Sequence, residues 1–287
     1  MFFSRLYDYI FALPQYLLPH HMLSRIMLRL TRIRITWLKN IFVPWFIRHF
    51  KVDMSEAVDE DWRHYPDFNS FFTRAIKPEV RPITTNAKEL ACPVDGTVSQ
   101  AGHIQTNQIF QAKGHSYSLQ TLVGDTELAT QFENGHFATL YLSPRDYHRI
   151  HMPVAGQLKR MIHVPGRLFS VNPATARTIP GLFARNERVV AIYDTEFGPM
   201  AMILVGAIFV ASIETIWHGV VTPPKGQQIR HWDYTDQNIK QDKGEEMGRF
   251  NMGSTVIVLF GPDHIQWHES IKAEASIRMG QTLGTHS

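Results

Sequence analysis

A glycine-serine pair near the end of the chain is the feature with the most specific chemistry. Gly253-Ser254-Thr255 directly precedes an apolar stretch, residues 255–260. Because Gly253 has no β-carbon, the Ser254 hydroxyl could attack its carbonyl carbon without steric hindrance. The peptide bond would become an ester, and loss of the serine α-proton would then cleave the chain and leave a pyruvoyl group. Alone, Gly-Ser-Thr is common in turns, so self-cleavage between Gly253 and Ser254 also requires a base.

Two histidines could supply this base. His148 and His151 are three residues apart in the stretch 141–153. If the chain forms a helical turn after Pro144, this spacing places both imidazoles on one face. An imidazole with an ordinary pKa of about 6.5 exchanges protons readily at neutral pH. Two alternatives remain open: hydrogen-bonded structural histidines, or two metal ligands. We expect no metal, because no motif supplies a third and a fourth ligand.

A carboxylate could orient the base. Asp95 precedes a glycine in the stretch 93–97, where Asp-Gly is first of all a turn signal. With Ser254 and one of the two histidines, it could form a set of nucleophile, base and orienting carboxylate. A membrane-surface serine hydrolase using Ser254, His151 and Asp95 is therefore an alternative. Ser254 lies in Asn-Met-Gly-Ser-Thr and lacks the Gly-x-Ser-x-Gly elbow typical of many hydrolases.

The elements that must position these residues are mostly strands. From residue 53 onward the chain consists of short β-branched and aromatic stretches separated by Gly and Pro. The pattern predicts strands at 96–104, 137–143, 156–164, 189–195, 200–217 (two strands around Gly206), 255–260 and 275–283. Short helices are predicted at 68–74, capped by Asn69 or Asp67, and at 182–187. We therefore predict an α+β, β-dominated catalytic domain over residues 53–287.

The first 52 residues differ from the rest in charge and texture. Eight basic residues against one acid, Asp8, give residues 1–51 a charge of +7, so the other 236 residues carry −4 of the net +3. Apolar residues recur at helical spacings, which predicts amphipathic helices broken at Pro14, Pro19 and Pro44. No uncharged apolar run approaches the roughly 18 to 20 residues needed to cross a bilayer.

This segment therefore predicts a helical anchor that lies at the surface of an anionic membrane. A helical cap on the protein's own core is the alternative, and a non-catalytic membrane-surface module is a further possibility for the whole chain. The single cysteine, Cys92, favours a reducing intracellular compartment. The small net charge of +3 gives no indication of nucleic-acid binding.

The three stretches around Asp95, His148 and Ser254, together with 113–119, 165–172 and 182–188, resemble the bacterial phosphatidylserine decarboxylase family. Family members cleave themselves within Leu-Gly-Ser-Thr, and the first position here is Met252, a change that conserves volume and apolarity. The resemblance implies a β chain, 1–253, and an α chain, 254–287. It also implies a covalent pyruvoyl cofactor made from Ser254 and conversion of phosphatidylserine to phosphatidylethanolamine and carbon dioxide.

The resemblance further implies roles for single residues. Ser254 is the nucleophile and pyruvoyl precursor, His151 the base for self-cleavage, Asp95 its orienting partner, and His148 a participant in decarboxylation. A peripheral location on the cytoplasmic face of the inner membrane follows, and a homodimer is plausible. Five residues are weaker candidates for binding the substrate headgroup: His115, Arg145, Arg149, Phe169 and Ser170.

Overall fold

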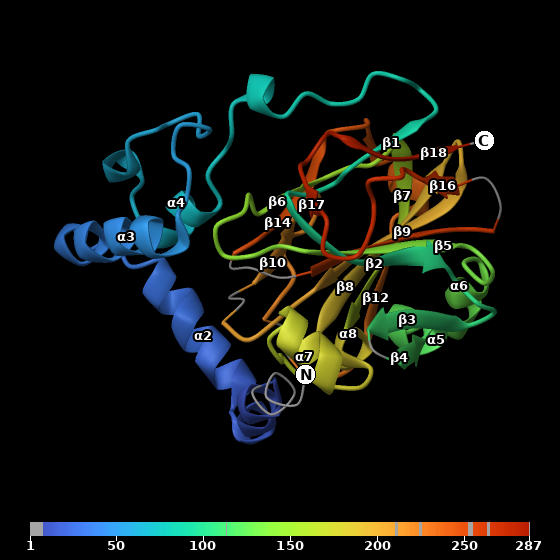
Figure 1. The fold of residues 1–287 in the computed structure, drawn as a ribbon, viewed down its shortest axis with the longest axis horizontal. Coiled ribbons are helices and arrows are strands. Elements are labelled where there is room, and N and C mark those ends of the chain that lie inside the picture. Colours follow the sequence, from blue (N-terminus) through green and yellow to red (C-terminus); the bar gives the residue numbers. More distant parts are fainter. Residues whose placement is uncertain are drawn as a thin grey trace.

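The computed structural model describes residues 8–112, 114–209, 212–223, 226–251, 255–262 and 265–286. A mostly antiparallel β core carries short helices on its surface, and the N-terminal helices lie on one side of it (Figure 1). The predicted α+β, β-dominated fold is confirmed. Met252, Gly253 and Ser254 lie outside the described residues. The structure places the strands that precede and follow them in the chain.

The largest sheet has nine strands in the described part of the chain. Their order is β12 (Arg230–Asp233), β7 (Gly156–Val164), β8 (Arg188–Thr195), β9 (Gly198–Val205), β15 (Thr255–Phe260), β5 (His136–Tyr141), β2 (Gly96–His103) and β17 (Ser276–Ile277), with β13 (Lys240–Gln241) also paired to β7. All neighbouring pairs in this sheet are antiparallel.

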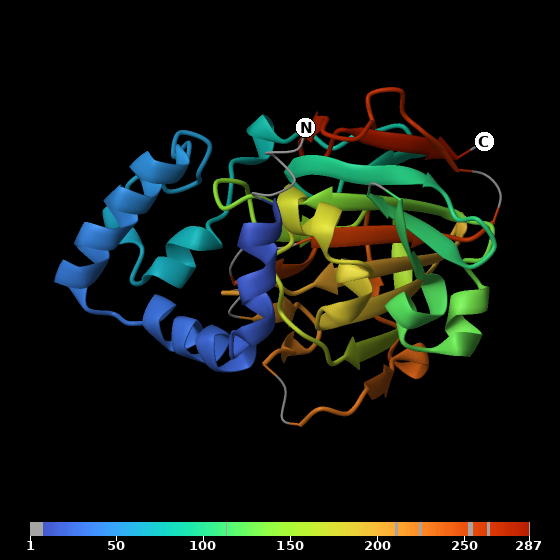
Figure 2. The same cartoon turned by 60° about the horizontal axis from the view of Figure 1, so that its bottom comes forward.

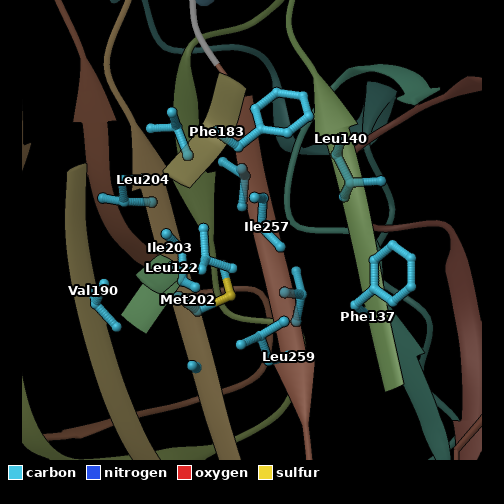
Figure 3. Packing of buried hydrophobic residues seen from close by; sticks show 14 of the residues in the cluster. Leu122, Phe137, Leu140, Phe183, Val190, Met202, Ile203, Leu204, Ile257 and Leu259 are labelled. Atoms are coloured by element: carbon cyan, nitrogen blue, oxygen red, sulfur yellow. The ribbon is translucent and has the colours of Figure 1, made fainter. Parts of the chain in front are cut away.

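The strand that follows Ser254 lies inside this sheet. Every residue of β15 is buried, as expected for an uninterrupted apolar run. Figure 3 shows Ile257 and Leu259 between side chains of β9, such as Leu204, and side chains of β5, such as Leu140. Thr255, the first residue of β15, is in register with Tyr141 of β5 and Val205 of β9. The residue after Ser254 is therefore held on both sides.

Three smaller sheets complete the described core. They are β11 (Gly219–Val220), β10 (Ile213–Thr215), β14 (Glu246–Phe250) and β6 (Arg149–His151); β1 (Glu89–Ala91), β18 (Thr282–His286) and β16 (Ile265–Trp267); and β3 (Gln108–Ala112) with β4 (His115–Ser118). The first of these sheets matters most for function. Its strand β14 leads into the segment that contains Ser254, and its strand β6 contains His151.

The helices are short, and local capping explains where several of them begin. They are α2 (His20–Thr31), α3 (Thr36–Phe50), α4 (Phe68–Phe72), α5 (Leu119–Val123), α6 (Thr126–Thr130), α7 (Pro173–Thr178) and α8 (Leu182–Arg185), with 3-10 turns at Leu13–Leu17, Trp62–His64, Pro78–Val80 and Thr235–Gln237. Asp67, Ser118, Asp125 and Asn172 each accept a hydrogen bond from the backbone N–H three residues ahead. Asp67 is thus the N-cap of α4, which confirms one of the two predicted caps, Asp67 and Asn69.

The N-terminal helices form a second hydrophobic cluster beside the core. Val43 and Phe46 of α3 pack with Phe68, Phe71 and Phe72 around α4, and Figure 2 shows these helices on the same side of the core as in Figure 1. This cluster crosses the predicted domain boundary at residue 52, and the division into two domains stays a prediction. In the described part of the chain, no helix is long and apolar enough to span a bilayer.

Most strand predictions are confirmed within two residues. Of the two strands predicted around Gly206, β9 confirms the first, whereas the second, β10, covers only Ile213–Thr215. Two other predictions are wrong. The predicted break at Pro44 does not occur, because α3 continues from Thr36 to Phe50. Burial of Val43 and Phe46 on either side of Pro44 offsets the lost backbone hydrogen bond. The single strand predicted at 275–283 is two strands, β17 and β18, separated by Gly280 with φ of 87°.

Candidate active site

The chain enters and leaves the segment that carries Gly253 and Ser254 at two anchored points. Before it, the N–H of Asn251 donates to the carbonyl of Ser212 at 2.9 Å, and the Asn251 side-chain amide donates to the Ser212 hydroxyl. After it, Thr255 starts the buried strand β15. The predicted roles of Gly253 and Ser254 themselves fall outside the described residues.

His148 is fully buried next to the first of these points. Its carbonyl accepts the N–H of Phe250 at 3.0 Å, and its ring lies 4.1 Å from the ring of Phe72 between centroids. Nδ1 donates to the carbonyl of Asp146 at 2.7 Å, whereas Nε2 is buried without a hydrogen-bond partner among the described residues. Burial lowers the pKa of His148 to about 3, so the ring is neutral and presents an unused lone pair.

His151 has both ring nitrogens engaged. Nδ1 donates to the carbonyl of Gly244 at 2.8 Å, because a carbonyl can only accept, and Nε2 accepts from the hydroxyl of Tyr147 at 3.0 Å. Burial lowers the pKa of His151, and the Gly244 carbonyl and the nearby charges of Glu246 and Asp95 oppose that shift. The ring is therefore held in one orientation as a neutral base.

The helical turn predicted for the two histidines is wrong. The chain turns at residues 144–146 and then enters strand β6, so His148 and His151 are not related by helical geometry. Pairing of Arg149 and Ile150 with β14 imposes the extended backbone. The tertiary structure still buries both rings in the same region, and each has different partners.

A backbone hydrogen bond brings the segment of Asp95 next to His151, but the Asp95 carboxylate binds a different side chain. The N–H of His151 donates to the carbonyl of Pro93 at 2.9 Å, two residues before Asp95. The carboxylate accepts from Arg81 Nε at 2.9 Å and Nη2 at 2.6 Å, and from the N–H of Met279 at 2.8 Å. Both oxygens of Asp95 are thus occupied by groups other than a histidine, and its described influence on His151 is through charge.

An apolar cavity of about 340 Å³ adjoins these residues between the N-terminal helices and the core. Phe72, which contacts the ring of His148, lines it together with Tyr141, which pairs with Thr255. Ser170, one of the weaker candidates, also lines this cavity. A cavity of this character beside the neutral imidazole of His148 suits a substrate with apolar parts.

The other weaker candidates lie in different settings. Arg149 is committed to Glu246 at 3.0 Å and to the carbonyl of Thr73 at 2.9 Å, while Arg145 is largely exposed. Phe169 is buried against the rings of Tyr16 and His20. His115 begins β4, in a hairpin that does not pair with the strands around the two histidines.

Three residues of the site were missed by reasoning from the sequence. Tyr147 stands inside the stretch 141–153, where its spacing of four from His151 was the only available signal. Phe72 is the last residue of α4 and Arg81 follows in the chain between α4 and β1, and no motif there points to His148 or Asp95. Among the described residues, no group of three or more His, Cys, Asp or Glu side chains could hold a metal ion.

Comparison with known proteins identifies the family. The family model described as phosphatidylserine decarboxylase matches residues 68–285, and a second model, described as PSD, matches residues 10–51. Proteins named phosphatidylserine decarboxylase proenzyme are 54% identical in Azotobacter vinelandii over 98% of this chain and 99% of the relative. The same name and 54% identity are found in Pseudomonas putida and Methylococcus capsulatus, over 96% of both chains in each case.

These matches confirm the predicted family and enzyme class, a carboxy-lyase, and give no support to the serine hydrolase alternative. They span both the N-terminal helical segment and the β core. The chain belongs to the phosphatidylserine decarboxylase family.

Proposed function

We propose that this chain cleaves itself between Gly253 and Ser254, converts Ser254 into a pyruvoyl group, and decarboxylates phosphatidylserine to phosphatidylethanolamine. The Ser254 hydroxyl attacks the Gly253 carbonyl carbon, and the peptide bond is replaced by an ester. Removal of the Ser254 α-proton then expels the carboxylate of Gly253, and water replaces the former serine nitrogen, which leaves as ammonia. The products are the β chain, 1–253, and the α chain, 254–287.

A single observation carries this proposal: neutral, buried imidazoles lie beside the chain that leads to Ser254. His148 accepts the N–H of Phe250, four residues before Ser254, and β6 with His151 pairs with β14. Within the described ranges Nε2 of His148 has no hydrogen-bond partner, and a polar group formed at this position could supply one, because a buried acceptor without a donor destabilises the fold. When present, a pyruvoyl group supplies the electron sink for loss of carbon dioxide.

The two histidines differ in ways that support different roles. We assign the base of self-cleavage to His151, which Tyr147 and Gly244 hold in place. Asp95 acts on it through charge, since Arg81 holds its oxygens. We assign the decarboxylation step to His148, whose Nε2 has no partner in the described part of the chain and can bind the substrate or exchange a proton with it. The adjoining apolar cavity would exclude water from the reacting carbon.

The N-terminal helices support action at a membrane surface. Eight apolar side chains of α2 and α3 are exposed: Met22, Ile26, Leu30, Trp37, Leu38, Ile41, Phe42 and Trp45. Basic residues accompany them, so the surface suits an anionic bilayer. We propose that the enzyme is a peripheral protein on the cytoplasmic face of the inner membrane, where it reaches a lipid that stays in the bilayer. We further propose that it forms a homodimer.

The test uses Ser254→Ala with Ser270→Ala, an exposed serine, as the matched control. Intact mass measurement should show two chains for the control, the 34-residue α chain being lighter than plain hydrolysis would leave it. Ser254→Ala should remain one chain and release no carbon dioxide from phosphatidylserine vesicles. A cleaved or active Ser254→Ala protein, or an active enzyme that retains an intact serine at 254, would refute the proposal.

A further inference from the structure

A polar cavity of about 270 Å³ lies between the N-terminal helical segment and the β core. Lys51 and Arg74 line it from the N-terminal side, and Arg145 and Arg278 line it from the core. It is distinct from the apolar cavity, with which it shares no lining residue. Junctions between structural units are common places for ligand sites.

The carboxylates around this cavity already have partners. Asp95 and Glu56 both bind Arg81, with distances of 2.6 Å from its Nη2 to each. Asp53 accepts two hydrogen bonds from the N–H and hydroxyl of a neighbouring serine, at 2.9 and 2.7 Å. Asp146 accepts a backbone N–H at 2.6 Å. The oxygens of these acids are thus largely hydrogen-bonded to groups other than Arg74 and Lys51.

Two cations of the cavity have no carboxylate within 4.0 Å among the residues that the structure describes: Arg74 and Lys51. Arg278 and Arg145 have only longer contacts with acids, at 3.5 Å to Glu56 and 3.8 Å to Asp146. The cavity lining holds five cations and four carboxylates, so its formal net charge is +1, and within the described ranges the two cations without a carboxylate contact are Arg74 and Lys51.

Arg74 is the residue that most requires an explanation. Only 6% of it is exposed, its Nε is buried without a described hydrogen-bond partner, and its Nη2 makes one long hydrogen bond of 3.4 Å to the Arg145 carbonyl. A buried guanidinium without an anion costs several kcal/mol. An anion in the cavity would remove that cost, and a guanidinium binds phosphate oxygens with favourable geometry.

We infer that this cavity binds a phosphate oxyanion, with Arg74 at its base and Lys51 at its mouth, and that the phosphodiester of a phospholipid headgroup supplies it. Lys51 caps the C-terminal end of α3, whose exposed apolar side chains form the proposed membrane surface. Tyr147 and Asp95 line the same cavity, so the phosphate would lie beside groups that act on His151. The lipid source rests on the proposed function, whereas phosphate binding does not.

The first experiment measures the thermal midpoint of the full chain against inorganic phosphate at constant ionic strength. The midpoint should rise and saturate as a one-site ligand predicts. Arg74→Gln should abolish the saturable rise, and Lys51→Gln should weaken phosphate binding at least about tenfold. Arg63→Gln, an exposed arginine outside the cavity, is the matched control and should behave as wild type.

If Arg74→Gln does not fold, Lys51→Gln and Arg278→Gln decide the matter, since both side chains are largely exposed. Absence of a saturable rise in wild type, or an equal rise in these variants, would overturn phosphate binding.

The second experiment separates the sources of phosphate by competition with glycerophosphoethanolamine, a soluble phosphodiester headgroup. If glycerophosphoethanolamine competes with inorganic phosphate, the cavity accepts a phosphodiester headgroup. If only inorganic phosphate binds, the lipid source of the phosphate is overturned. The same titration on Ser254→Ala keeps the two proposals apart. A chain that decarboxylates normally without a phosphate effect defeats only this inference, and one that binds phosphate yet never forms pyruvoyl defeats only the proposed function.

Discussion

The hydroxyl of Tyr147 donates a hydrogen bond to Nε2 of His151 at 3.0 Å, and the two rings are stacked with centroids 5.6 Å apart. The Gly244 carbonyl occupies the other ring nitrogen at 2.8 Å. The imidazole therefore has one tautomer and one orientation. Any proton that His151 accepts must reach Nε2 past the Tyr147 hydroxyl or through it. We therefore predict that this tyrosine is a positioning residue for the proposed self-cleavage.

Tyr147→Phe removes the hydroxyl and keeps the ring. We expect self-cleavage to slow by roughly tenfold, the value of one hydrogen bond of about 1.4 kcal/mol, and its pH profile to change because Nε2 loses its donor. The cut fraction is followed on denaturing gels at several pH values. Tyr65→Phe removes a hydroxyl bound to the Asp59 carbonyl and serves as the control. Equal rates and profiles for Tyr147→Phe and the control would contradict the assignment.

Arg81→Met should strongly destabilise the fold. Its guanidinium and the Asp95 carboxylate are nearly inaccessible, with side-chain exposures of 4% and 9%. Removal of one partner leaves a buried charge unpaired, which costs about 3 to 5 kcal/mol in the free energy of unfolding. Urea denaturation measures this loss.

The control for Arg81→Met is Arg63→Met, which breaks an exposed ion pair with Asp61. Such pairs contribute about 0 to 1 kcal/mol. If the two variants were equally stable, the pair between Arg81 and Asp95 would not have the structural importance that its geometry indicates.

Stability should fall as the pH drops below neutrality. Burial lowers the pKa of His20 to about 4 and that of His148 to about 3, whereas the unfolded chain takes up these protons near pH 6.5. Below pH 6.5 the unfolded state binds more protons, so each histidine contributes a loss of up to about 1.4 kcal/mol per pH unit. The loss from His20 ends near pH 4.

Urea denaturation between pH 4.5 and 7.5 measures this dependence, with His20→Gln as the variant. Below pH 6.5 the slope of the unfolding free energy against pH should be smaller than in wild type by up to about 1.4 kcal/mol per pH unit, which corresponds to the uptake of one proton. His231→Gln, whose side chain is half exposed, is the control. An unchanged slope in His20→Gln would show that His20 is not buried as a neutral ring.

Membrane binding should depend on single exposed side chains of α3. Trp37 is 67% exposed and Ile41 is 66% exposed. Replacing either with Gln should remove about 1 to 2 kcal/mol of apolar transfer energy, which weakens binding to anionic vesicles roughly 5-fold to 30-fold. Vesicle co-sedimentation measures it, with Val58→Gln as the control because Val58 is 60% exposed outside α2 and α3. Equal losses for all three variants would argue against α3 as the contact surface.

Local patterns in the sequence predicted the family and most strands of the largest sheet, but not β6 and β14, the strands beside the candidate site. Strand 156–164 matches β7 and strand 255–260 matches β15 at both ends, because each apolar stretch is bounded by turn residues close to it in the chain. The prediction failed at Pro44 and at 275–283, where packing and a glycine turn decided the outcome. The packing around α3 joins residues that are distant in sequence, which a local pattern does not compare.

The sequence by itself predicted Gly253 and Ser254 as the reacting pair, and it determined the presence of two nearby histidines and a basic amphipathic segment at the N-terminus. These features are read from residue type and short spacing. Only the tertiary structure decided that Arg81 holds Asp95, that Tyr147 holds His151, and that burial leaves His148 neutral, with Nε2 unpartnered among the residues that the structure describes. A hydrogen bond or a pKa depends on which groups folding brings together and how far it removes them from water.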